Sequence, residues 1–442
     1  MSLKDDEDQA PSCLLVTLVD NAGVTRAKLV PSSRVDVVAR KGVGLSPAFF
    51  GMAVDDHVLA LRPDMAVGDM RLVPDLQAKR RLSAALDWAP VDQLDQDLQP
   101  MPACARSAAR RVQEAATQRG FEYRMAFEFE FTLFGEDPVT GIYGPAHSGP
   151  GYGLTPFLLL EDFLLDLAQS LADARIDVEQ IHPEYGEGQI EVSIAPADPV
   201  TAADSAVLTR LVIARTALRH GCRASFAPIS AASGVGNGAH LHVSALEAGS
   251  NVFADGDQAC GMTVQGAAMV SALVTSLPDL VGLYAPSVLS AARLLPGMWS
   301  GAWVCWGPEN REAGVRFIQG AAGHGQASAN CEVKVIDPAA NPYLVVATVV
   351  ATTQEALSRA APVLAPVTTD PAFLTDEERR RTGVGHLPAT LGEALDRLAR
   401  SSLRAALGDE LVDSFVAVHR YEDAMYSALD LEQRIELLRW KY

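Results

Sequence analysis

The stretch MAFEFEFTLF, residues 125–134, places two glutamates among regularly spaced phenylalanines. Side chains of an extended strand alternate between its two faces, so Glu128 and Glu130 point one way and the phenylalanines around them point the other. Two neighbouring carboxylates repel each other unless a counter-charge faces them. The stretch therefore predicts a strand whose aromatic face enters the core and whose acidic face meets something positive.

The bulk composition limits the classes of partner. The 442 residues are 48% hydrophobic, which permits a large core, and carry a formal net charge of −19. Such a surface repels nucleic acid and anionic membranes. The charged start does not resemble a signal peptide, and apolar runs such as YLVVATVVA are too short to span a bilayer. Six scattered cysteines without CxxC or zinc spacing are typical of a reduced protein. We expect a cytoplasmic protein without nucleic-acid or membrane partners.

The order of the periodic segments predicts an α+β protein. Residues 11–40 contain two β segments joined by a turn at Asn-Ala-Gly, and residues 41–100 show little helical periodicity. A helical segment then ends at Gly120. Strands and helices follow without regular βαβ alternation, which favours an antiparallel sheet. We expect one domain over residues 1–100 and a second over residues 101–442.

The sequence predicts the boundaries of several later helices and strands. Helices are expected over residues 156–175, 200–220 and 263–285, from Pro342 onward, and through the tail beyond 376. Strands are expected over residues 177–182, 189–195 and 239–246, and in CEVKVID. The glycine-rich region 296–330 is expected to be irregular.

Four of the strand-like segments carry acids or histidines at alternating positions. A solvated outer face explains any one of them, but apolar flanking residues favour a sheet that lines a cavity. Clustered carboxylates in a cavity need a counter-charge, and oxygen-rich ligands with an imidazole suit Mg²⁺ or Mn²⁺. The residues are Glu128 and Glu130, Glu191, His240 and His242, and Glu332 with Lys334, and the turn before Glu191 adds Glu184.

Arginines supply positive charge near glycine-rich segments. Arg293 lies in ARLLPG, and Arg311 and Arg316 lie in ENREAGVRF. Arginine can clamp phosphate or carboxylate with two hydrogen bonds, although ordinary surface arginines are the alternative. No GxGxxG in a strand–helix context and no GxxxxGK[ST] occurs, so ATP, if used, is not bound by a Rossmann turn or P-loop.

Six segments in order resemble the glutamine synthetase family: FEFEFTLF, HPEYGEGQIE, GNGAHLHVS, ARLLPG, ENREAGVRF and CEVKVIDPAANPYL. The resemblance implies a small N-terminal β-grasp-like domain. It also implies a larger catalytic domain with a curved antiparallel sheet flanked by helices. It further implies a ring-shaped homo-oligomer, expected to be a dodecamer, whose active sites are shared between neighbouring subunits.

The resemblance also implies roles for individual residues. One Mg²⁺ or Mn²⁺ ion would be held by Glu130, Glu184 and Glu191, and the other by Glu128, His240 and Glu332. The nucleotide side would include Glu179, His242 and Ser244. Glutamate would be held by Gly236 and Arg293, and the transferring phosphoryl group would be neutralised by Arg311 and Arg316. ATP would convert the γ-carboxylate of glutamate to an acyl phosphate, which an amine then attacks.

Departures from the family pattern concern the substrates. Trp299 stands where ammonia-using members have a glutamate, and Phe50 stands where they have an acid, unless a slipped loop lets nearby Asp55 take that place. An apolar wall suits a larger amine better than ammonium. Lys334 replaces an arginine and loses its bidentate fork. Val235 replaces an asparagine beside Gly236, so recognition of the donor acid can differ.

Three hypotheses follow. The first is an ATP- and metal-dependent ligase that joins glutamate to an organic amine, with Lys334 and Trp299 at the substrates. The second is an ordinary glutamine synthetase that uses ammonia. The third is a non-catalytic structural or regulatory paralogue. Retention of six candidate metal ligands and both phosphate arginines argues against the third, since a scaffold does not need them.

Overall fold

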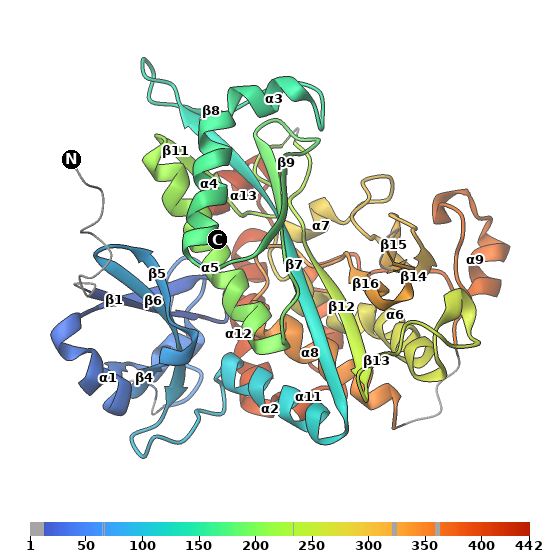
Figure 1. Ribbon diagram of the computed structural model, residues 1–442, viewed down its shortest axis with the longest axis horizontal. Helices are drawn as coiled ribbons and strands as arrows, with labels where there is room; N and C mark the ends of the chain where they lie inside the picture. The colour runs from blue at the N-terminus through green and yellow to red at the C-terminus, as the bar shows by residue number, and fades with distance from the viewer. Residues whose placement is uncertain (1–12, 64, 66, 233, 321–324, 359–362) are drawn as a thin grey trace.

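The computed structural model describes residues 13–63, 65, 67–232, 234–320, 325–358 and 363–442. Figure 1 shows a small sheet near the N-terminus beside a larger body built on a second sheet. The predicted α+β class and its two-sheet architecture are confirmed. The first sheet ends with β6 (Leu86–Leu94), and α2 (Ala105–Gln118) follows it, so the proposed domain boundary at residue 100 falls in the connection between them.

The smaller sheet has the strand order β2-β1-β6-β4-β3, and β5 pairs with β6. The predicted Asn-Ala-Gly turn is confirmed, because β1 and β2 form an antiparallel hairpin around it. β1 and β6 run parallel. The remaining elements are β1 (Cys13–Val19), β2 (Thr25–Pro31), α1 (Val35–Lys41), β3 (Val43–Leu45), β4 (Met70–Pro74) and β5 (Arg80–Ser83).

The larger sheet has the order β17-β14-β15-β16-β12-β7-β10-β9, with β8, β11 and β13 added at its margins. Its long central strand, β7 (Phe121–Glu136), alternates as the sequence predicts, with its phenylalanines almost fully buried. The other strands are β8 (Tyr143–Pro145), β9 (Val178–Pro183), β10 (Gln189–Ile194), β11 (Cys222–Ser225), β12 (Ala239–Glu247), β13 (Ser250–Asn251), β14 (Trp303–Pro308), β15 (Ala313–Ile318), β16 (Asn330–Val333) and β17 (Gly385–His386).

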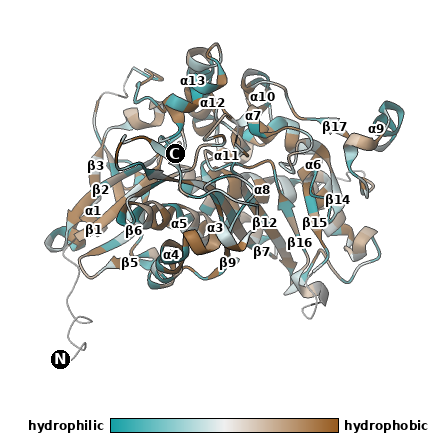
Figure 2. Ribbon diagram, turned by 90° about the horizontal axis from the view of Figure 1, so that it is seen from above, coloured by the Kyte–Doolittle hydropathy of each residue, from teal (hydrophilic) through white to brown (hydrophobic). Residues whose placement is uncertain are grey.

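Helix α8 packs against α2, α5 and α6, and the four helices share one hydrophobic core with the buried face of β7. Figure 2 shows the same arrangement from above, with each residue coloured by its hydropathy. The helices after α2 are α3 (Leu154–Leu159), α4 (Glu161–Asp173), α5 (Pro199–Arg219), α6 (Val264–Tyr284), α7 (Ser290–Arg293), α8 (Pro342–Ala356), α9 (Asp376–Thr382), α10 (Leu391–Leu398), α11 (Arg404–Leu407), α12 (Asp409–Tyr426) and α13 (Leu431–Leu438).

Three sequence-based expectations were wrong. Region 296–330 is not irregular but contains β14 and β15, which pair in parallel. The glycines of this region interrupt the alternation that predicts a strand. Gly314 allows close packing, since a Cβ there would lie 2.6 Å from Leu277 Cδ1. The helix expected over 156–175 is two helices that meet at Leu160. Helix α6 is long and apolar enough to cross a membrane, contrary to the sequence-based expectation, but most of it is buried in the core.

The hairpin turn of the small sheet docks directly on the larger body. Gly23 has φ +78°, and a Cβ there would lie 2.0 Å from the Ala339 carbonyl oxygen. Asn341 Nδ2 donates to the carbonyl oxygens of Val19 and Asp20. The same asparagine caps α8, because its Oδ1 accepts from Tyr343 N. The DPAANPYL segment is therefore the seam that fixes the small sheet to the large one.

Candidate active site

The register of the large sheet brings the predicted acidic residues together as cross-strand neighbours. Glu130 on β7 faces Glu191 on β10, which in turn faces His182 on β9. Glu128 faces His240 on β12. Because partners directly opposite each other have their Cβ atoms about 5 Å apart, one sheet face collects these groups without help from loops.

Two groups of possible metal ligands result on this face. His182, Glu184 and Glu191 offer ligand atoms within 4.8 Å of one another, and so do Glu128, His242 and Glu332. The first group contains His182, which the sequence analysis did not name, and the second contains His242, which it assigned to the nucleotide side. Glu130 instead accepts hydrogen bonds from Gly238 N at 2.7 Å and from Gln189 Nε2 at 3.2 Å. This face of the sheet therefore carries two clusters of acids and histidines, and which residues hold an ion stays a prediction.

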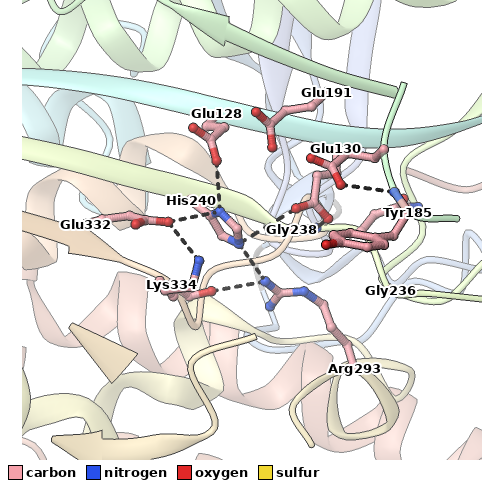
Figure 3. A network of polar contacts seen from close by, with 12 residues as sticks. Glu128, Glu130, Tyr185, Glu191, Gly236, Gly238, His240, Arg293, Glu332 and Lys334 are labelled. Atoms are coloured by element: carbon pink, nitrogen blue, oxygen red, sulfur yellow. Dashed lines mark hydrogen bonds and ion pairs between the residues drawn. The ribbon is translucent and has the colours of Figure 1, made fainter. Parts of the chain in front are cut away.

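His240 lies at the centre of the network drawn in Figure 3. Its Nδ1 is 3.2 Å from both Glu128 Oε1 and Glu332 Oε1. Its Nε2 is 3.2 Å from Arg293 NH2, and that guanidinium also donates to the Lys334 and Val335 carbonyl oxygens. Arg293 is thus held rigidly beside the acids.

The GNGAH loop leaves no room for side chains next to this arginine. A Cβ on Gly236 would lie 2.7 Å from Arg293 Cγ. A Cβ on Gly238 would lie 2.5 Å from His240 Nε2 and 2.7 Å from Arg293 NH2. Both glycines are needed for this close approach of backbone to functional side chains.

Two cationic residues contact Glu332, and a third lies near Trp299. Lys334 is buried and donates to Glu332 Oε1 at 2.9 Å, while Arg316 NH1 donates to Glu332 Oε2 at 3.1 Å. Arg316 NH2 also donates to Glu309 Oε2 at 2.6 Å. Arg311 is exposed and lines a cavity together with Glu130 and Trp299. Its guanidinium is 5.7 Å from the Trp299 ring centroid.

A family model described as glutamine synthetase, catalytic domain, matches residues 102–436. The chain belongs to the glutamine synthetase family. It is 41% identical over 97% of its length to the gamma-glutamylpolyamine synthetase GlnA3 of Streptomyces coelicolor, 93% of which is covered. It is 27% identical over 96% of its length to the glutamine synthetase of Halobacterium salinarum, with 93% of that protein covered.

Solved structures agree with this family assignment. A crystal structure titled as a novel glutamine synthase homolog matches with a TM-score of 0.86 and 31% identity, covering 97% of this chain and 99% of that one. A GmaS/ADP complex matches with a TM-score of 0.83 and 26% identity, covering 97% of this chain and 96% of that one. Membership of this family makes the protein a carbon–nitrogen ligase.

The acids of this glutamine synthetase family member differ in their ionisation. Burial and the charges of Glu128 and Glu130 raise the pKa of Glu191 to about 7, although His182 opposes the shift. Burial likewise raises the pKa of Glu184. Burial also acts on Glu128, but hydrogen bonds from His240 and His242 hold the pKa of that carboxyl well below its usual range. Burial therefore dominates at Glu191, whereas hydrogen bonds from two histidines dominate at Glu128.

The residues expected on the nucleotide side of this family's site are separated from one another. His242 lies 3.6 Å from Glu128 Oε2, next to the acids, and its Nδ1 is 3.0 Å from Asn330 Oδ1. Ser244 donates to the Ala329 carbonyl oxygen on the neighbouring segment. Glu179 is exposed on β9. His242 therefore joins the acid cluster, while Ser244 and Glu179 lie further along their strands.

The N-terminal residues that depart from the family pattern are engaged within their own chain. Phe50 is buried in the core of the small sheet. Asp55 Oδ2 accepts hydrogen bonds from Tyr421 and Tyr426 on α12, at 3.0 and 2.8 Å. The alternative role for Asp55 as the family's missing acid would require it to leave these tyrosines or to act while bound to them.

The sequence analysis did not name His182, which belongs to the first group of possible ligands, or Tyr152 and Tyr185, which line a cavity with Glu130 and Glu184. His182 lies two residues before Glu184, so strand periodicity could have placed it on the same face. Tyr152 could not have been found this way, because it comes from a glycine-rich loop whose path the sequence does not reveal. Its hydroxyl donates to Glu184 Oε1 at 2.5 Å.

Proposed function

We propose that this protein uses ATP to join the γ-carboxylate of glutamate to an organic amine, with Mg²⁺ or Mn²⁺ bound at the acidic face of the sheet. The observation that carries the acceptor choice is Trp299. Its half-exposed ring lies in the same cavity as Glu130, Glu184 and Arg293, where ammonia-using members have a carboxylate. The relatives support both an amine acceptor and a nucleotide, since one is a gamma-glutamylpolyamine synthetase and one solved structure is an ADP complex.

The residues present fit a divalent cation. Glu184 and Glu191 are buried in one cavity, and burial raises the pKa of both carboxyls, so a bound cation would stabilise their ionised forms. We propose that His182, Glu184 and Glu191, with Glu130 beside them, hold one ion. Glu128, Glu332 and one of the two histidines His240 and His242 would hold the other. Such ions, when bound, neutralise phosphate oxygens and polarise the phosphoryl group.

The remaining groups bind and orient the substrates. In the first step, a γ-carboxylate oxygen of glutamate bonds to the terminal phosphorus of ATP, and ADP leaves. In the second step, the amine nitrogen bonds to the acyl carbon, phosphate leaves with the bridging oxygen, and the nitrogen loses a proton. We assign Arg293 and Gly236 to glutamate, with Lys334 nearby, and Arg311 and Arg316 to the phosphoryl charge. His242, Ser244 and Glu179 are assigned to the nucleotide side.

Phosphate release from ATP and glutamate tests the proposal. The purified protein would be assayed with Mg²⁺ or Mn²⁺ across ammonia, ethanolamine, monoamines, polyamines and aniline, with mass spectrometry of the amide product. We expect higher kcat/KM with at least one organic amine than with ammonia. Ammonia matching every amine would establish an ordinary glutamine synthetase instead. No turnover with any acceptor or donor acid would favour the non-catalytic alternative.

A substitution at the acceptor wall sharpens this test. Trp299→Glu restores the carboxylate of ammonia-using members, and we expect it to raise the ratio of ammonia to organic-amine kcat/KM at least tenfold. An unchanged ratio would mean that Trp299 does not contact the acceptor. Phe373→Leu, which alters an exposed ring outside this cavity, is the matched control.

The assembly and location are also proposals. We propose a ring-shaped homo-oligomer, expected to be a dodecamer, with shared active sites, in the cytoplasm. The six cysteines are free, in keeping with a reducing compartment.

A further inference from the structure

The cavity mouth carries three aromatic rings in sequential contact. The Tyr152 and Tyr185 ring centroids are 5.3 Å apart at an interplanar angle of 86°, and those of Tyr185 and Trp299 are 5.9 Å apart at 85°. All three side chains line the cavity that contains Glu130 and Glu184, and all three are half-exposed. Large aromatic rings left open to solvent, rather than packed in a core, are available to a ligand.

The backbone at this mouth is held in an uncommon conformation. Tyr152 has φ +56° and Trp299 has φ +52°, and they are the only aromatic residues among the described non-glycine residues with positive φ. Bulky side chains disfavour this left-handed region, and such residues persist where the surroundings enforce them, often at functional sites. Both strained aromatic residues lie at the same cavity mouth.

A buried carboxylate enforces the conformation at Trp299. Glu312 Oε1 accepts from Trp299 N at 2.9 Å, and its Oε2 accepts from Gly297 N at 3.1 Å. Glu312 is only 4% exposed, so these bonds are shielded from water. Its carboxylate clamps the turn that presents the ring, which makes Glu312 a positioning residue.

A carboxylate and a guanidinium of the chain itself lie against these rings. Glu184 accepts from the Tyr152 hydroxyl and, through its other oxygen, from Tyr185 N at 3.0 Å. The Trp299 ring already has the Arg311 guanidinium near it, which is a cation–π contact within the structure itself. Aromatic side chains that line a cavity are the arrangement by which proteins recognise alkylammonium groups.

We infer that Tyr152, Tyr185 and Trp299 form a cation–π cage for a second, non-reacting ammonium group of the acceptor. The favoured acceptors are therefore diamines or longer polyamines, in which hydrocarbon separates the reacting nitrogen from the caged one. This inference rests on the proposed function, because it concerns the acceptor of that same reaction. A monoamine of equal length can fill the hydrocarbon path but leaves the cage without its cation.

Matched acceptors test the cage without any mutation. The wild-type protein would be assayed with 1,5-diaminopentane, its mono-N-acetyl derivative and n-pentylamine. We expect the KM for the diamine to be about tenfold lower than for either acceptor without the second charge, the range that a desolvated cation–π contact supplies. Equal KM values would overturn the cage while leaving the ligase proposal intact. No amide product from any of these or from other amines would instead overturn the proposed function.

Substitutions test which of the three rings belong to the cage. Tyr185→Leu and Trp299→Leu should each reduce the KM preference for the diamine to less than threefold, whereas Tyr185→Phe should retain it because the ring remains. Glu312→Gln should weaken the preference and should be rescued partly by Glu312→Asp. Phe373→Leu is the control, and melting temperatures verify folding. If Tyr185→Leu retained the full diamine preference, Tyr185 would not belong to the cage.

Discussion

Gly238 shows how a single missing side chain shapes this active site. Its N–H donates to Glu130, and a Cβ would collide with His240 and Arg293. Both clashing groups are side-chain ends that can move, so we expect Gly238→Ala to fold normally but to displace the network. Activity should fall at least 100-fold, since misplacement by about 1 Å can have that effect.

The control for this substitution is Gly135→Ala on β7, where a Cβ would meet nothing within 4 Å. Its melting temperature and activity should match those of the wild-type protein. Retention of full activity by Gly238→Ala would show that the tight contact with Arg293 is not needed for turnover.

Glu191 gives the metal-free protein a definite pH dependence. Its pKa is raised from 4.5 to about 7 on folding, chiefly by burial. The unfolded chain therefore ionises first, and the folded protein loses stability as pH rises from about 4.5 to 7. The Glu191→Gln variant has no ionisable group at this position. Its free energy of unfolding should therefore rise relative to that of the wild-type protein across this window, by up to about 3 kcal/mol at 1.36 kcal/mol per pKa unit.

Chelator-treated wild-type and variant proteins would be compared by thermal denaturation from pH 4.5 to 8. The difference in melting temperature should widen up to about pH 7 and level off above it. A constant difference across that range would mean that Glu191 titrates at its ordinary pKa.

The hairpin between β1 and β2 is the element that locks the two sheets together. Gly23→Ala would add both left-handed strain and a direct collision with the Ala339 carbonyl. We expect it to destabilise the protein by more than 2 kcal/mol, roughly the cost of strain plus a disrupted interface. Denaturant titration would measure this loss.

Gly120→Ala separates the two causes, because Gly120 also has positive φ (+87°) but would meet nothing within 4 Å. It should cost only about 1 kcal/mol. Equal losses from both substitutions would mean that the hairpin contact contributes nothing to stability.

The central strands were predictable from the sequence, and the elements at the cavity mouth were not. The alternation of Glu128 and Glu130 with phenylalanines is a purely local pattern, so β7 could be read directly. β14 and β15 depend on glycines such as Gly314 that pack under α6, which is a tertiary requirement. His240 and His242 both lie against Glu128, and strand periodicity alone does not tell which of the two would hold an ion.

The thermal stability of the whole protein should depend on divalent cations that bind the acidic face of the sheet. Binding to the folded state alone stabilises a protein by about 2.7 kcal/mol at one hundred times the dissociation constant. We therefore expect millimolar Mn²⁺ or Mg²⁺ to raise the melting temperature, and ADP with the metal to raise it further. Glu191→Gln should reduce the metal-induced shift. An unchanged melting temperature with both ions would contradict the proposed metal sites.

The acidic groups and the aromatic rings of the site come from different kinds of segment. Except for Glu184, the acids and histidines stand on paired strands, where a slip of one residue would turn them into the core. The aromatic rings come from connecting segments around residues 152, 185 and 299, outside every strand. If the proposed function holds, acceptor preference can evolve separately, because an exchange of short loops would redirect the enzyme to new amines and leave the acids on the strands unchanged.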